Sequence, residues 1–130
     1  MYELTVETEF SAAHSLAGYE GPCAQLHGHN YRVIVHIAGE ELDDRGMLLD
    51  FGEIKRLCES FVGELDHRHL NELPAFADQN PTSENIARHI FESVKGALAA
   101  APGLGGRSIR PVKVTVYENA RSAASYTESP

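Results

Sequence analysis

Apolar and polar residues alternate along two stretches of the first forty residues. In the first stretch, residues 2–10, the even positions include Leu4, Val6 and Phe10. In the second, every second residue from Tyr31 to Ile37 is apolar. Because successive side chains of a strand point to opposite faces, this period predicts two strands that are each buried on one face. Pairing of the two strands as a hairpin is the simplest arrangement.

The middle of the chain changes to a helical period. Asp50, followed three residues later by Glu53, resembles an N-terminal cap and predicts that a helix begins there. A second helix is expected to begin near Thr82 or Ser83, either of which can cap it, and His89 is expected to be a solvated residue of that helix. The apolar face of the first helix comprises Phe51, Ile54, Leu57, Cys58, Phe61, Val62 and Leu65. That of the second comprises Ile86, Ala87, Ile90, Val94 and Leu98.

Alternation returns near the end of the chain. Val112, Val114 and Val116 predict a third strand, and residues 122–127 predict a weaker fourth one. The order is strand, strand, helix, helix, strand, strand. It predicts an α+β fold, in which a four-stranded antiparallel sheet carries both helices on one face. No linker or low-complexity tract divides residues 1–130, which we interpret as a single domain.

Composition narrows the class of protein. The chain has 130 residues, of which 42% are hydrophobic and 23% charged, as in a folded globular domain. Its formal net charge of −8 argues against a generic nucleic-acid binder, because phosphate attraction needs a basic surface. We expect neither a membrane span nor a signal peptide, and hence a cytoplasmic location. Two cysteines do not form a disulfide framework, and Cys58, within an apolar stripe, is expected to be an inert core thiol.

The strongest chemical signal is a set of three histidines. His27 and His29, separated by one glycine, point to the same side of an extended chain, and His14 continues the even positions of the first strand. If the two strands pair, the three imidazoles converge. Three neutral imidazoles suit Zn²⁺, and a fourth position left open indicates a catalytic site. Two alternatives stay open: Cys23, in the connecting loop, closes a structural site as fourth ligand, or His27 and His29 are ordinary polar residues of a turn.

Two further groups could carry chemistry. Asp66 and His67 could act as an orienting acid and a base if the chain forms a loop there, or they could end the preceding helix near its last carbonyls. Glu118 continues the phase of the valines of the third strand and would point inward. A buried carboxylate is costly without a partner or ligand, whereas a strand that ends at Tyr117 would leave Glu118 exposed.

Several blocks of the sequence together resemble the family of 6-pyruvoyltetrahydropterin and 6-carboxytetrahydropterin synthases. The resemblance runs from about Leu4 to Tyr126. The blocks are His14, Cys23-x-x-x-His27-Gly28-His29, Asp50-Phe51, Leu65-Asp66-His67, Pro81-Thr82-Ser83-Glu84-Asn85 and Glu118. A departure from the pattern follows Glu118, where the threonine frequent in relatives is replaced by Asn119.

The resemblance implies a tunnelling fold, in which subunits join their sheets into a barrel, as a homohexamer built from two trimers. The three residues between Cys23 and His27 resemble the spacing in the carboxy-forming enzymes. The implied reaction converts 7,8-dihydroneopterin triphosphate to 6-carboxy-5,6,7,8-tetrahydropterin, acetaldehyde and triphosphate, on the route to queuosine and other 7-deazapurines. Alternatives are a sibling that forms the pyruvoyl product and a zinc-binding module without catalysis.

The resemblance also implies roles for individual residues. Cys23 would be the base that abstracts a proton, His67 assisted by Asp66 its catalytic partner, and Glu118 the anchor of the pterin. The implied zinc ligands are His14, His27 and His29. At the start of the second helix, the residues that would contact the substrate are Thr82, Ser83 and Glu84. The remaining histidines match no functional position of the family and are expected to be structural or surface residues: His36, His69 and His89.

Overall fold

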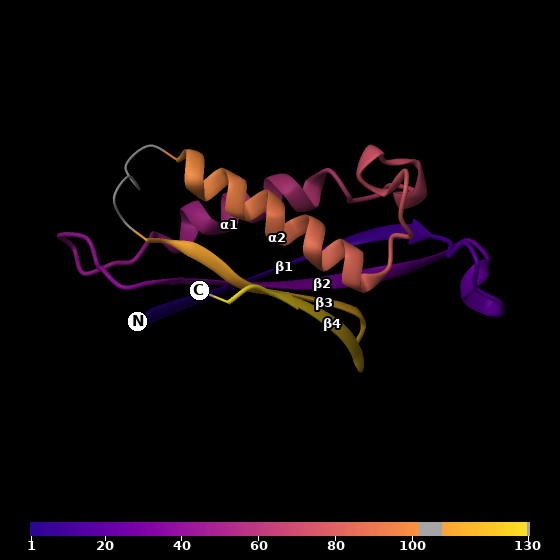
Figure 1. The fold of residues 1–130 in the computed structure, drawn as a ribbon, viewed down its shortest axis with the longest axis horizontal. Helices are drawn as coiled ribbons and strands as arrows, with labels where there is room; N and C mark the ends of the chain where they lie inside the picture. The colour runs from indigo at the N-terminus through magenta and orange to yellow at the C-terminus, as the bar shows by residue number, and fades with distance from the viewer. Residues whose placement is uncertain (102–107, 130) are drawn as a thin grey trace.

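A four-stranded antiparallel sheet, in the order β1-β2-β3-β4, carries two helices on one face (Figure 1). The computed structural model describes residues 1–101 and 108–129, without the side chain of Cys23. The strands are β1 (Tyr2–His14), β2 (His27–Gly39), β3 (Arg110–Asn119) and β4 (Ser122–Thr127). The helices are α1 (Phe51–Gly63) and α2 (Ser83–Ala100), with short 3-10 turns η1 (Pro22–Ala24), η2 (Leu70–Glu72) and η3 (Pro74–Phe76). The predicted element order and α+β class are confirmed.

The hairpin of β1 and β2 is longer than the apolar runs that predicted it. The two strands pair antiparallel from Tyr2 opposite Gly39 to His14 opposite His27. Phe10 and His14 are buried on the face covered by the helices, which is the face of the even positions of β1. The strands therefore extend into the histidines themselves, and the connection of residues 15–26 begins and ends beside them.

Both helices begin where their caps predict. The side chain of Asp50 accepts hydrogen bonds from the backbone N–H groups of Gly52 and Glu53, and Thr82 caps α2 by accepting from Asn85. Such caps satisfy N–H groups that the helix itself leaves unpaired. The core lies between these helices and the sheet. Its most deeply buried side chains include Tyr31, Phe91, Ile37, Ile54, Leu65 and Leu70.

Two predictions about single side chains of the helices are wrong. Phe51 is 60% exposed and borders a surface hollow, whereas Leu49 of the preceding loop packs against the core. His89 is half-buried: the ring of Phe76 packs at 5.6 Å from its ring, and burial lowers its pKa. The prediction for Cys58 is confirmed, since this thiol is buried and burial raises its pKa to about 11.

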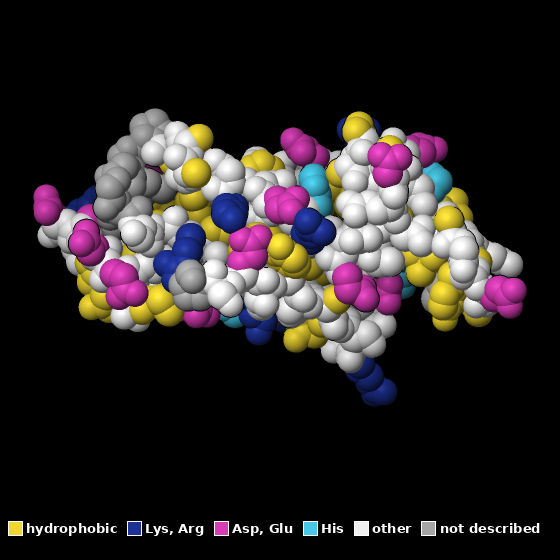
Figure 2. Space-filling model, in the orientation of Figure 1, with side chains coloured by type: hydrophobic (Ala, Val, Ile, Leu, Met, Phe, Trp, Pro, Cys, Tyr) yellow, Lys and Arg dark blue, Asp and Glu magenta, His cyan; other side chains and the backbone are white. Residues whose placement is uncertain are grey.

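The surface contains charges of both signs. Acidic and basic side chains are interspersed over the face shown in Figure 2, in keeping with a net charge of −8 and without one continuous basic patch on that face. Neither of the described helices combines the length and apolar character needed to cross a membrane.

Candidate metal centre

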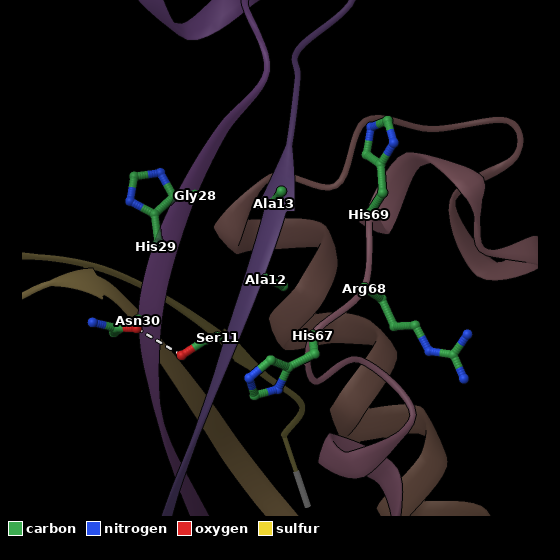
Figure 3. A pocket seen from close by; sticks show the side chains of 9 residues that line it. All are labelled: Ser11, Ala12, Ala13, Gly28, His29, Asn30, His67, Arg68 and His69. Carbon is green, nitrogen blue, oxygen red and sulfur yellow. Dashed lines mark hydrogen bonds between the residues drawn. The ribbon is translucent and has the colours of Figure 1, made fainter.

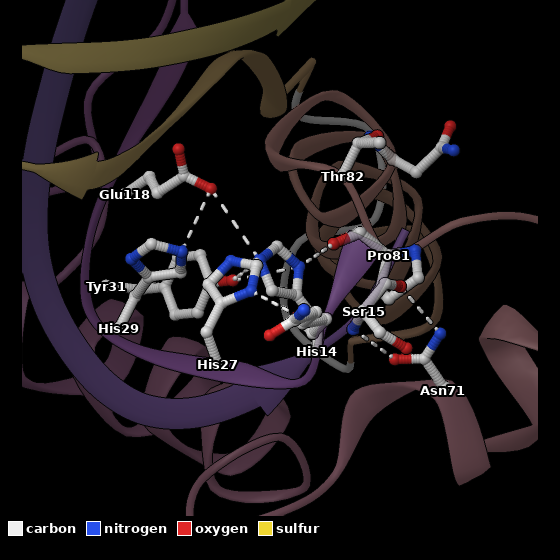
Figure 4. A network of polar contacts seen from close by, with 11 residues as sticks. His14, Ser15, His27, His29, Tyr31, Asn71, Pro81, Thr82 and Glu118 are labelled. Atoms are coloured by element: carbon white, nitrogen blue, oxygen red, sulfur yellow. Dashed lines mark hydrogen bonds and ion pairs between the residues drawn. The ribbon is translucent and has the colours of Figure 1, made fainter. Parts of the chain in front are cut away.

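Four side chains converge at the end of the sheet where β1 passes into β2. His14 and His27 face each other across the hairpin, with 3.0 Å between their Nε2 atoms. The Nε2 atom of His29 lies 3.2 Å from Oε1 of Glu118, and that of His14 lies 3.7 Å from the same oxygen. One ligand atom from each residue lies within 4.8 Å of all the others (Figure 4). We call this set, His14, His27, His29 and Glu118, the histidine–glutamate cluster.

The strand pairing explains how Glu118 reaches the cluster. Arg32 pairs with Tyr117, so Glu118 follows at the level of Tyr31. The pairing of β3 with β4 shifts between Tyr117 and Asn119, which leaves Glu118 as the residue out of register. A bulge of this kind can re-aim a side chain. The carboxylate points toward the histidines and is one-third exposed, whereas His14 is almost completely buried.

The outer nitrogens of two histidines are fixed by backbone carbonyls. Nδ1 of His14 donates to the carbonyl oxygen of Pro81 at 2.7 Å, and Nδ1 of His27 donates to that of Gln25 at 2.7 Å. A carbonyl can only accept, so each neutral ring carries its proton on Nδ1 and a lone pair on Nε2. These two lone pairs face each other at 3.0 Å, an arrangement that repels unless a cation lies between them.

His29 supplies a third nitrogen, Nε2, which has the Glu118 carboxylate beside it at 3.2 Å. Its Nε2 atom is buried and has no hydrogen-bond partner among the described residues. Burial lowers the pKa of His29, with a smaller lowering by the two neighbouring histidines, while Glu118 acts in the opposite direction. A neutral imidazole with an unpartnered lone pair can bind a metal, since metals bind the deprotonated nitrogen. The donor set of three imidazoles and one carboxylate therefore fits a bound metal ion.

Tyr31 packs beneath the cluster. Its hydroxyl lies 3.3 Å from Nδ1 and 3.4 Å from Nε2 of His14, and its ring stacks on Phe10 at 4.7 Å. Burial raises the pKa of Tyr31, and the charge of Glu118 raises it further, so the hydroxyl keeps its proton. Tyr31 was not predicted as a site residue, although it shares the strand phase of His27 and His29. The Pro81 carbonyl leaves no signal in the sequence.

Asp66 and His67 lie apart from the cluster, at the outer edge of β1. His67 donates from Nδ1 to Asp66 at 2.9 Å, and Asp66 accepts from the backbone N–H of Ser11 at 2.9 Å. Since His67 has a φ of 58°, the chain leaves regular structure there, as the acid–base interpretation requires. In the described part of the chain, no hydrogen bond or ion pair joins Asp66 or His67 to the histidine–glutamate cluster.

A shallow hollow of about 520 Å³ separates His29 from His67. Figure 3 shows His29 on its β2 side and His67 on its β1 side. Its floor is built from small or polar residues of the two strands. Within the chain, the two groups of predicted site residues thus occupy opposite borders of one hollow, with His67 83% exposed to solvent.

The other predicted site residues have structural surroundings. Thr82 caps α2, and Ser83 and Glu84 form its first turn beside Pro81. Cys23 belongs to η1 within the connection of residues 15–26, and its side chain lies outside the described part of the structure. The predicted thiol base is therefore placed only by its backbone.

Comparison with known proteins gives one consistent result. The chain matches the family model described as 6-pyruvoyl tetrahydropterin synthase over residues 3–129. It is 37% identical to a 6-carboxy-5,6,7,8-tetrahydropterin synthase of Synechocystis, with 97% of this chain and 93% of that protein covered. It is 40% identical to a protein of Archaeoglobus fulgidus described as a "Putative 6-carboxy-5,6,7,8-tetrahydropterin synthase", over 81% of this chain and 82% of that protein.

The solved structures agree with the fold. The 6-pyruvoyl tetrahydropterin synthase of Caenorhabditis elegans superposes with a TM-score of 0.77 at 30% identity, over 99% of this chain and 98% of that chain. The 6-pyruvoyltetrahydropterin synthase of Plasmodium vivax has a TM-score of 0.77 at 23% identity, over 99% of this chain and 98% of that chain, and shares the fold. The arrangement of four strands and two helices is thus one that these synthases also have.

Proposed function

The chain belongs to the 6-pyruvoyl tetrahydropterin synthase family, and we propose that it is a zinc-dependent lyase of the carboxy-forming kind. Its reaction would convert 7,8-dihydroneopterin triphosphate to 6-carboxy-5,6,7,8-tetrahydropterin, acetaldehyde and triphosphate, in a cytoplasmic route to queuosine and other 7-deazapurines. The names of the relatives from Synechocystis and Archaeoglobus fulgidus support this choice of product. The observation that carries the proposal is the pair of opposed imidazole lone pairs at 3.0 Å in the histidine–glutamate cluster.

The metal site of this proposal uses the chain's own donors. His14, His27 and His29 would hold Zn²⁺ through Nε2, with Nδ1 of the first two kept on backbone carbonyls. When bound, zinc supplies Lewis-acid chemistry, which stabilises negative charge that develops on the oxygens of the substrate side chain. The partly exposed side of the cluster, at His29 and Glu118, is where a substrate can approach.

Glu118 would anchor the pterin. A pterin presents a ring N–H and an amino group side by side, and one carboxylate can accept both in a charge-assisted pair. Its position beside the histidines would place the pterin side chain next to the metal. Oε1 of Glu118 lies 3.2 Å from Nε2 of His29, a distance that would also suit Glu118 as a fourth metal ligand. Substrate binding would then have to displace Glu118 from the metal.

Proton transfer would fall to Cys23 and His67. A thiol near the metal can become thiolate at neutral pH and take a proton from the substrate side chain, and His67, oriented by Asp66, can return it elsewhere. Because His67 lies at the outer edge of β1 and out of contact with its own cluster, it would serve the cluster of a second copy. This placement supports the proposed homohexamer, two trimers whose sheets join at their edge strands into a barrel.

Product analysis tests the proposal directly. Zinc-loaded protein is incubated with 7,8-dihydroneopterin triphosphate, and the products are identified by mass spectrometry. We expect 6-carboxytetrahydropterin together with acetaldehyde. The pyruvoyl product would instead identify the sibling activity, which the C. elegans relative is named for. If the zinc-loaded protein turned over no pterin, the remaining interpretation would be a zinc-binding module without catalysis.

A further inference from the structure

Two asparagine side chains hold the backbone directly after His14. Asn71 accepts from the N–H of Ser15 and donates to its carbonyl oxygen, both at 2.9 Å. Asn80 does the same for Ala17, again with both distances 2.9 Å. Each amide thereby completes both hydrogen bonds of one residue, as a neighbouring strand would. The pairing of β1 with β2 ends at His14, so the asparagines take over where the sheet stops.

The segment that contains Asn80 also contacts the His14 ring. Pro81 follows Asn80, and its carbonyl is the acceptor for Nδ1 of His14. The carbonyl of Asn80 in turn accepts from the side chain of Asn85 at 2.8 Å, on the first turn of α2. Figure 4 shows Asn71 on Ser15 and Pro81 on His14, side by side at the end of β1. The acceptor that fixes the His14 tautomer is thus itself held on one side by Asn80 and on the other by Thr82, which caps α2.

We propose that Asn71 and Asn80 are positioning residues for the metal ligand His14, and that they set the metal affinity of the cluster. Asn80 clamps Ala17 to the segment that carries the Pro81 carbonyl, and Asn71 clamps Ser15, the residue next to His14, to the turn η2. Together they keep Nδ1 on the Pro81 carbonyl and Nε2 aimed at the cluster. Partners outside the ligand shell orient ligands in this way, and their loss weakens metal binding. The inference rests on the metal-binding part of the proposed function and gives the block around Asn80 and Pro81 a role toward the metal.

Alanine variants of the two asparagines test the clamp. The zinc dissociation constant is measured by competition with a chromophoric chelator for the wild type, Asn71→Ala and Asn80→Ala. We expect each variant to bind zinc about 10-fold or more weakly, the effect typical of lost outer-shell partners. Gln79→Ala is the matched control, since among the described residues this neighbouring amide donates to the Ala75 carbonyl within its own segment and not to residues 15–17. Its zinc affinity should equal that of the wild type.

A second measurement separates positioning from general stability. In zinc-loaded wild type, solvent exchange of the His14 Nδ1–H, followed by NMR, should be slow; in Asn80→Ala it should be faster, and in Gln79→Ala unchanged. If the alanine variants do not fold, Asn71→Asp and Asn80→Asp, which keep the acceptor and lose the donor, should show the same weakening. Unchanged zinc affinity in folded variants with a lowered melting temperature would overturn the clamp alone. A wild type that binds no zinc would overturn the proposed metal site as well.

Discussion

The chain contains two His-x-His sequences whose surroundings differ completely. His27 and His29 lie on β2, on the face that also receives His14, and join the cluster of ligand atoms. His67 and His69 lie along the outer edge of β1, where the backbone of Ala13 donates to Arg68 at 3.0 Å and residue 69 bridges β1 in parallel. The described residues hold a group of converging ligand atoms at the first pair and none at the second.

The partners of the outer nitrogens explain the difference in chemistry. Nδ1 of His27 donates to a backbone carbonyl, whereas Nδ1 of His67 pairs with Asp66 at 2.9 Å and that of His69 with Glu72 at 3.3 Å. A backbone carbonyl fixes the tautomer that leaves Nε2 free to bind a metal, while a carboxylate can orient an exposed imidazole for proton transfer. Identical spacing therefore sets only the side on which two imidazoles point. The neighbouring strand and the outer partner decide what they do.

The largest expected effect is on zinc binding, tested separately at each of the two His-x-His pairs. We expect His27→Ala to lower zinc affinity by more than about 100-fold, because the loss of a ligand should exceed the loss of an outer partner. His69→Ala should keep one zinc per chain, measured by chelator competition and elemental analysis. Equal weakening in both variants would mean that the second pair also binds metal.

The next effect concerns catalysis at the first pair. Cys23→Ala should retain zinc and lower turnover by about 100- to 10,000-fold, the usual contribution of a positioned acid or base. Cys58→Ala, a change to a buried thiol, is the control and should keep its turnover. Metal content and steady-state rates of the zinc-loaded proteins decide the matter. Loss of zinc in Cys23→Ala would show instead that the thiol is a ligand.

A third experiment sharpens the role of the second pair. His67→Asn should lower turnover by at least about 100-fold with zinc content unchanged, whereas His69→Ala should leave turnover largely intact. Mixing His67→Asn with Cys23→Ala subunits should restore part of the activity, because a mixed assembly can unite an intact His67 with an intact Cys23. Full activity of His67→Asn alone would remove this residue from the mechanism.

The smallest effect is one on acid stability. The backbone N–H of Ser11, followed by the ring of His67, lowers the pKa of the Asp66 carboxyl. The unfolded chain then binds the proton more readily, so the stabilisation is complete above the ordinary carboxyl pKa of about 4 and is lost as the pH falls through the lower folded value. Urea midpoints between pH 2 and 5 should fall less steeply for Asp66→Asn than for the wild type. Equal slopes would contradict this assignment.

Local patterns in the sequence were sufficient for the elements and for the three histidines. Alternation locates the hairpin, and since a strand has a strict period of two, it also fixes the shared side of His14, His27 and His29. Capping chemistry locates the starts of α1 and α2. These features depend on residues close together in the chain or on one strand pairing.

Features that depend on distant contacts were not predictable in this way. Phe51 has the correct helical spacing, yet it stays exposed while Leu49 of the preceding loop packs against the core. Burial of His89 depends on Phe76, in a separate turn of the chain. The approach of Glu118 to His29 needs a register shift between β3 and β4, and the role of Pro81 rests on a backbone atom that every residue has.

The backbone at His67 limits which replacements there are informative. A φ of 58° is reached by asparagine and glycine at low cost, whereas most side chains, and β-branched ones above all, are strained in this region. Alanine at this position would therefore alter the chain path and the imidazole at once, and any loss of activity would have two causes. Asparagine keeps the left-handed turn and removes only the ring. A saturation library at position 67 should accordingly favour small turn-forming residues for expression, whatever their chemistry.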